Sequence, residues 1–124
     1  MTELEKQCNF SRCAAQLILF AYDQGYKITL GEAYRSPETA EIYAKAGKGI
    51  KNSLHRRRLA IDLNLFKDGQ YLSRSEDYKP LGDYWKSLSC LNYTCVWGGD
   101  FIDDKTGLPA PDGNHFSFLH LNLK

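Results

Sequence analysis

Residues 53–66 read Ser-Leu-His-Arg-Arg-Arg-Leu-Ala-Ile-Asp-Leu-Asn-Leu-Phe, and this stretch predicts the centre of the fold. From Leu59 onward, apolar residues alternate with others, which is the period of a β-strand with one face in a core. Asp62 falls on the face opposite the row of leucines and isoleucine. An ionised carboxylate is costly to bury without a partner, so Asp62 either faces solvent or meets a cation.

Three helices are expected around this strand. The first covers residues 3–24, ends at Gly25, and carries an apolar stripe at three- and four-residue steps. The second begins at Ser36-Pro37, a capping residue followed by a proline in the first turn, and ends near residue 46. The third covers residues 79–90. The stripe of the first helix consists of Phe10, Cys13, Ala14, Leu17, Phe20 and Ala21.

Further strands are expected at residues 26–34, 71–72, 95–97 and 115–121, whereas residues 101–113 hold the glycines, prolines and aspartates of a surface loop. No repeat or linker interrupts the chain. The expected fold is therefore α+β, a small antiparallel sheet with packed helices, in a single domain that spans residues 1–124.

The overall composition restricts the class of protein. The chain has 124 residues and a net charge of +1, which argues against bulk nucleic acid as the main partner. No apolar run approaches the roughly 20 residues that cross a bilayer, so no stable membrane association is expected. The first residues lack the pattern of a signal peptide, which predicts synthesis in the cytoplasm. We expect a monomer.

The cysteines do not suggest a metal or redox motif. Cys8, Cys13, Cys90 and Cys95 form no C-x-x-C pair. Since Cys8 and Cys13 fall in the apolar pattern of the first helix, buried free thiols are expected there rather than a disulfide.

A second polar segment, Asp112-Gly113-Asn114-His115-Phe116, complements the first. Two histidines and an aspartate from separate segments can hold Zn²⁺ on three sides and leave the fourth for water. Taken singly, His55 is a common loop histidine and Asp62 a common solvent-facing acid. His115 as a third ligand favours a zinc site made of His55, Asp62 and His115. Asp112 lies where a base for the water is useful, which suggests a small zinc peptidase.

With these residues the chain resembles the zinc D-alanyl-D-alanine carboxypeptidases and the phage L-alanyl-D-glutamate peptidases that serve as endolysins. Their first motif, S-x-H-x-x-G-x-A-x-D, is matched at Ser53, His55, Ala60 and Asp62. Their second motif, an acid, two further residues and then a histidine, is matched at Asp112 to His115. A Tyr-Arg before a helix stands at Tyr34-Arg35, and the Trp-Gly-Gly-Asp of the endolysin branch stands at residues 97–100.

The resemblance implies roles for these residues. The zinc ligands would be His55, Asp62 and His115, with Asp112 as general base and acid and Arg35 at the substrate carbonyl or carboxylate. Ser53 would support the metal site or the substrate backbone, and Trp97 and Asp100 would lie near the substrate. The substrate would be bacterial peptidoglycan, hydrolysed at the L-Ala–D-Glu bond. An endolysin of this kind would wait in the host cytoplasm until the membrane becomes permeable.

The chain departs from the family pattern at one ligand-bearing loop. Arg58 stands where the family has glycine, so this loop either runs differently or sends Arg58 into the cleft. The residues after His115 are apolar and neutral, where many relatives have an acid. We assign the other candidate ligand, His120, to structure or surface.

Three other functions remain open from the sequence. A pocket for a free C-terminal carboxylate would make the protein a D-Ala-D-Ala carboxypeptidase, and a structural or vestigial metal would make it a non-catalytic zinc-binding module. Nucleic-acid binding is the third, because one local run is basic. That run consists of Lys48, Lys51, Arg56, Arg57 and Arg58.

Overall fold

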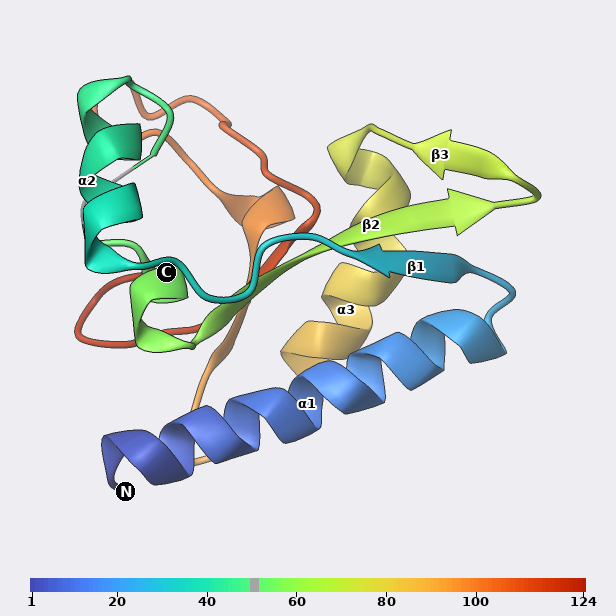
Figure 1. The fold of residues 1–124 in the computed structure, drawn as a ribbon. Coiled ribbons are helices and arrows are strands. Elements are labelled where there is room, and N and C mark those ends of the chain that lie inside the picture. The colour runs from blue at the N-terminus through green and yellow to red at the C-terminus, as the bar shows by residue number, and fades with distance from the viewer. Residues whose placement is uncertain (50–51) are drawn as a thin grey trace.

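The fold was analysed in a computed structural model, which describes residues 1–49 and 52–124. Lys51 of the predicted basic run lies outside the described residues. Within them, three helices accompany an antiparallel sheet, as Figure 1 shows, and the expected α+β fold is confirmed. The helices are α1 (Glu3–Asp23), α2 (Pro37–Lys45) and α3 (Lys79–Ser87). The strands are β1 (Lys27–Leu30), β2 (Ala60–Lys67), β3 (Gln70–Leu72), β4 (Cys95–Trp97) and β5 (His115–Phe118).

Strand β2 is the centre of the sheet, whose order is β1-β2-β5-β4 with β3 also paired to β2. One edge of β2 pairs with β1, from Leu63 to Phe66. The other edge pairs with β5 along residues 60–62 and with β3 along residues 65–67. The longest strand, β2, therefore pairs with every other strand of the sheet except β4.

The core lies between the sheet and the pair of helices α1 and α3, which contact each other. Thr2 caps α1 with a reciprocal capping box to Glu5, and the predicted stripe places Phe10, Cys13, Leu17 and Ala21 in the core. Trp85 of α3 is fully buried, and its indole N–H lies 3.0 Å from the carbonyl of Val96 and 3.1 Å from that of Ser117. A buried indole thus ties α3 to both β4 and β5.

Several boundaries differ from the sequence expectation. The predicted strand 26–34 ends at Leu30, the strand 115–121 ends at Phe118, and the third helix ends at Ser87. A 3₁₀ helix, η1 (Leu54–Arg57), was not predicted. The prediction for Cys8 was wrong: its side chain is exposed, while that of Cys13 is buried. Among the described residues, no helix is both long enough and apolar enough to cross a bilayer.

Gly82 allows α3 to approach the indole of Trp97. A Cβ at Gly82 would lie only 2.6 Å from Trp97 Cε2 and would overlap the ring. Alanine normally stabilises a helix interior by about 0.8–1 kcal/mol relative to glycine. We expect Gly82→Ala to reverse this sign and to lower the free energy of unfolding by about 1–3 kcal/mol through overpacking.

Urea unfolding of the variant would measure this change. Ser11→Ala, on an exposed face of α1, is the control and should stay within about 0.5 kcal/mol of the parent. A Gly82→Ala protein as stable as the parent would show that Trp97 can move without cost.

Candidate metal centre

The site is built on the backbone of Asp62, which is paired on both edges. His115 on β5 is its direct partner, so the two side chains share one face of the sheet. On the opposite edge, Gly31 N donates to Asp62 O and Asp62 N donates to Glu32 O, both at 2.8 Å. A Cβ at Gly31 would lie 2.8 Å from Asp62 O, so glycine is required for this approach. Asp62 is thus fixed by the sheet itself.

The third side chain, His55, comes from η1 and is buried. Ser53 caps η1, and its Oγ accepts a hydrogen bond from His55 N at 3.1 Å. The ring nitrogen Nδ1 of His55 lies 3.1 Å from the carbonyl of Ala33. A carbonyl can only accept, so Nδ1 carries the proton and Nε2 presents its lone pair toward Asp62.

The three side chains meet with the spacing of metal ligands. His55 Nε2 lies 3.5 Å from Asp62 Oδ1, and His115 Nδ1 lies 3.4 Å from the same oxygen. One ligand atom from each residue lies within 4.8 Å of the others. Zinc bonds of 2.0–2.2 Å in a tetrahedron separate neighbouring ligand atoms by about 3.4 Å, so the observed spacing fits this ion.

Unpaired polar atoms support the same conclusion. Asp62 Oδ1 and His115 Nε2 are buried without a hydrogen-bond partner in the described part of the chain. Such atoms are rare in folded proteins because each costs free energy, and a bound cation would satisfy the carboxylate oxygen. Two imidazoles and a carboxylate are also a donor set that zinc accepts. These residues therefore fit a zinc ion.

Burial and neighbouring charges shift the pKa values in the metal-free protein. Burial alone raises the pKa of Asp62, but the electrostatic interactions with the nearby imidazoles of His115 and His55 outweigh it and lower the pKa to about 2. For His55, burial lowers the pKa, and the interactions with Asp62, Ala33 and Glu32 overcome this and raise it. Asp62 is therefore an anion at neutral pH, ready to bind a cation.

Asp112 reaches the same site through the loop before β5. Its carbonyl accepts from His115 N at 3.1 Å, and its own N–H donates to Gly98 O at 2.8 Å. A Cβ at Gly98 would overlap the carbonyl of Asp112 and lie 2.9 Å from His115 Cβ. The Asp112 side chain is exposed at the edge of the site, yet partial burial, aided by the charge of Asp62, raises its pKa. A raised pKa suits a carboxylate that takes and returns a proton.

Arg35 adjoins the metal site through Glu32, a residue that the sequence analysis missed. Arg35 N donates to the His55 carbonyl at 3.0 Å, and its guanidinium donates to Glu32 Oε1 through Nε, at 2.8 Å, and through Nη2. The same oxygen lies 3.7 Å from His55 Nδ1, and the guanidinium lies 4.9 Å from the ring centre of Tyr43. Glu32 therefore holds Arg35 beside a metal ligand. The sequence signal that could have identified Glu32 is its position three residues before Arg35, the predicted substrate arginine.

The other predicted substrate residues have structural contacts. Trp97 is buried, and its indole N–H donates to Gly113 O at 2.7 Å. Asp100 is exposed, and its carboxylate lies 2.8 Å from Lys86 Nζ. Ser53 is buried at the cap of η1. Their roles in substrate binding, like those of Arg35 and Asp112 in catalysis, stay predictions.

Two open questions from the sequence have structural answers. Arg58 takes the left-handed conformation (φ 57°, ψ 35°) that favours glycine, the residue expected there. Its guanidinium stacks 4.0 Å from the ring centre of Tyr34. His120 lies beyond the end of β5, with Nδ1 3.2 Å from Lys6 Nζ, apart from the three clustered ligands.

Comparison with known proteins identifies solved structures that share this fold. No family profile matches the sequence, and no curated protein matches it. Among solved structures, the L-Ala D-Glu endopeptidase ChiX of Serratia marcescens aligns with 88% of this chain and 77% of its own, with a TM-score of 0.65 and 17% identity. The vancomycin-resistance D,D-pentapeptidase VanY of a VanB-type cassette, solved with Zn(II), aligns with 91% of this chain and 72% of its own, with a TM-score of 0.57 and 18% identity. The chain shares the fold of these two peptidases.

The ligand assignment predicts the metal content of variants. We expect the parent protein to bind one zinc ion per chain, and His55→Ala and His115→Ala to lose it, because two remaining ligands hold zinc poorly. Elemental analysis after dialysis against zinc-buffered solution would measure this. His120→Ala is the matched control and should keep its zinc. Full zinc content in both ligand variants would contradict the assignment.

The low pKa of Asp62 predicts an acid-sensitive fold in the metal-free protein. Because the folded-state pKa, about 2, lies below the ordinary value of 3.8, ionised Asp62 stabilises the fold above pH 4, and this contribution is lost as the pH falls toward 2. Its size is about 2 kcal/mol.

Urea unfolding of chelator-treated protein at pH 5 and pH 2.5 would test this, with Asp62→Asn for comparison. The parent should lose about 2 kcal/mol more than the variant over this interval. Equal losses in both proteins would show that the two histidines do not stabilise the carboxylate.

Proposed function

We propose that this protein is a zinc peptidase of bacterial peptidoglycan that hydrolyses the L-Ala–D-Glu bond of wall stem peptides. The observation on which this proposal rests is a set of three ligand atoms spaced for zinc, from two buried histidines and a partly buried aspartate, with the carboxylate of Asp112 at the edge of the same site. A purely structural zinc site closes its fourth position with another protein ligand, whereas three protein ligands and a nearby base are typical of hydrolytic sites. The fold shared with two solved peptidases supports this proposal.

The catalytic roles follow from the positions of the side chains. Zinc held by His55, Asp62 and His115 would supply a water of lowered pKa. Asp112 would take a proton from that water and later return it to the leaving amine, a task that its raised pKa favours. Arg35, held by Glu32, would place a positive charge near the substrate carbonyl, where negative charge develops during the attack.

The choice of bond is part of the proposal. One structural neighbour is an L-Ala D-Glu endopeptidase and the other a D,D-pentapeptidase, so both substrate types occur on this fold. We favour the L-Ala–D-Glu bond because residues 97–100 match the endolysin pattern. As a phage endolysin, the protein would stay in the host cytoplasm until membrane permeabilisation and would act as a monomer. A D-Ala-D-Ala carboxypeptidase is the second candidate.

Digestion of purified peptidoglycan by the zinc-loaded protein tests this function. We expect chelator-sensitive release of stem peptides with a new N-terminal D-Glu, identified by mass spectrometry. Release of D-Ala alone would assign the protein to the carboxypeptidases. Absence of any product would leave a non-catalytic zinc-binding module, and salt-sensitive DNA binding by the same sample would favour the nucleic-acid alternative.

Asp112→Asn separates catalysis from metal binding. The amide cannot accept the proton, while the three zinc ligands are untouched, so we expect full zinc content and a loss of turnover of about 10²-fold or more. Asp103→Asn, in the exposed loop before β5, is the control and should keep the parent rate. Near-parent hydrolysis by Asp112→Asn would remove this residue from the mechanism.

A further inference from the structure

The positive charge of the chain is concentrated around η1. Residues 45–58 contain six lysines and arginines and no acidic residue, whereas the net charge of the whole chain is only +1. The remainder of the chain is therefore net negative. A local excess of one sign attracts ligands of the opposite sign to that part of the surface.

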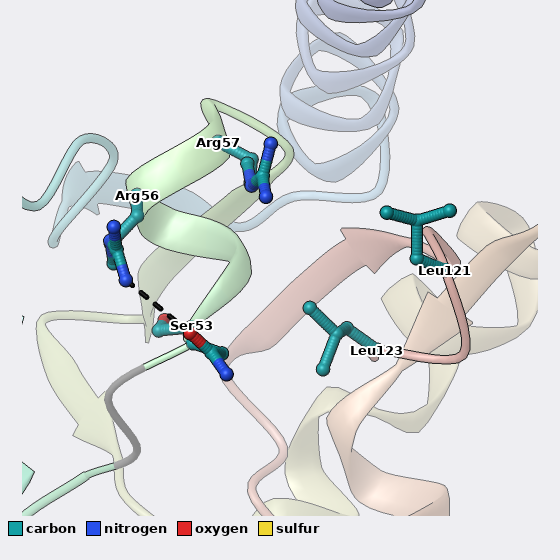
Figure 2. A pocket seen from close by; sticks show the side chains of 6 residues that line it. Ser53, Arg56, Arg57, Leu121 and Leu123 are labelled. Atoms are coloured by element: carbon teal, nitrogen blue, oxygen red, sulfur yellow. Dashed lines mark hydrogen bonds between the residues drawn. The ribbon is translucent and has the colours of Figure 1, made fainter.

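Two of these arginines line a cavity next to the metal centre. The cavity has a volume of about 300 Å³. Figure 2 shows Arg56 and Arg57 on the η1 side, and Leu121 and Leu123 across from them on the C-terminal segment. Ser53 and Asn52 complete the lining. One wall is thus cationic and the opposite wall apolar.

The apolar wall is held by a tight turn. His120 N donates to Leu123 O at 3.0 Å, and Leu123 N donates to His120 O at 2.8 Å. Both residues between them have positive φ, 48° at Leu121 and 65° at Asn122. This conformation is costly for leucine, and it leaves 74% of the Leu121 surface exposed. The turn therefore presents the apolar side chain of Leu121 to solvent on the side of the cavity opposite the arginines.

The cationic wall is anchored at its base. Gln7 Nε2 donates to the Arg57 carbonyl at 2.8 Å, and Arg57 Nη1 lies 3.2 Å from Glu3 Oε1. Both partners of this ion pair are nearly half exposed, so the pair contributes little and a ligand anion can replace Glu3. Arg56 Nη1 lies 3.4 Å from Asn52 Oδ1, the contact drawn in Figure 2.

Ser53 joins this cavity to the metal centre. It lines the cavity, and its hydroxyl accepts the N–H of the zinc ligand candidate His55. Two residues of extended chain span at most about 7 Å, so the backbone of a cavity residue lies close to that of a zinc ligand candidate.

We infer that this cavity binds a carboxylate of the acidic stem peptide beside the metal centre, and that Leu121 and Leu123 contact neighbouring alanine methyl groups. This inference rests on the proposed function, since it names how that substrate is held. Guanidinium groups pair well with carboxylates, and a nearby apolar wall strengthens the pairing by excluding water.

Binding of synthetic stem peptides to the zinc-loaded Asp112→Asn protein tests this inference without turnover. Isothermal titration calorimetry would compare L-Ala–D-Glu–L-Lys–D-Ala with two forms, one amidated at the D-Glu α-carboxylate and one at the C-terminus. We expect Arg57→Ala and Arg56→Ala, added to this background, to weaken binding of the unmodified peptide about tenfold each. One of the two amidations should weaken binding to the same extent and abolish the effect of the arginine variants.

Arg12→Ala, on an exposed face of α1, is the matched control and should bind as the background does. Equal affinity of the arginine variants and this control, or no peptide binding at all, would overturn the inference. Glycerol phosphate that binds through the arginines, with no effect of either amidation, would assign the cavity to a wall phosphate and would also overturn it. Failure of the proposed function would be seen in a different experiment, the digestion of peptidoglycan, where the parent protein would cleave no bond.

Discussion

The antiparallel register of β2 and β5 is the constraint on which the site depends. Asp62 and His115 face each other only because Ala60 pairs with Ser117 and Ile61 with Phe116. A slip of one residue would turn Asp62 or His115 into the core and would bring apolar side chains to the metal face. The buried row on β2 resists such a slip, since Leu63 and Leu65 are fully buried. Core packing therefore sets the distance between two metal ligands.

The same register creates an electrostatic cost in the metal-free protein. A buried carboxylate oxygen lies between two imidazoles that cannot both donate to it in their neutral forms, because Ala33 holds the proton of His55 on the far nitrogen. Protonation of His55 can supply the missing donor, and so can a bound cation. Zinc binding and protonation of His55 are thus alternatives at this site.

The sequence predicted what depends on local periodicity. The alternation after Leu59 predicted β2, and the apolar stripe predicted most of the buried face of α1. Ser36-Pro37 predicted the start of α2. The three grouped ligands also followed from motif spacing. Glu32 lies only three residues before Arg35, but its place beside His55 depends on the backbone hydrogen bond from Asp62 N, which sequence patterns do not show. Cys8 was misplaced because a helical stripe does not show where the partner surface ends.

The Trp-Gly-Gly-Asp segment shows how the core and the site share residues. Trp97 packs against Gly82 and donates to the carbonyl of Gly113, while Gly98 accepts from Asp112 N. These contacts hold the segment with the proposed base, Asp112, against the end of β4. A side chain at Gly82 or at Gly98 would displace them. A motif that resembles a substrate-binding signature in sequence thus acts here on the position of Asp112 relative to His115.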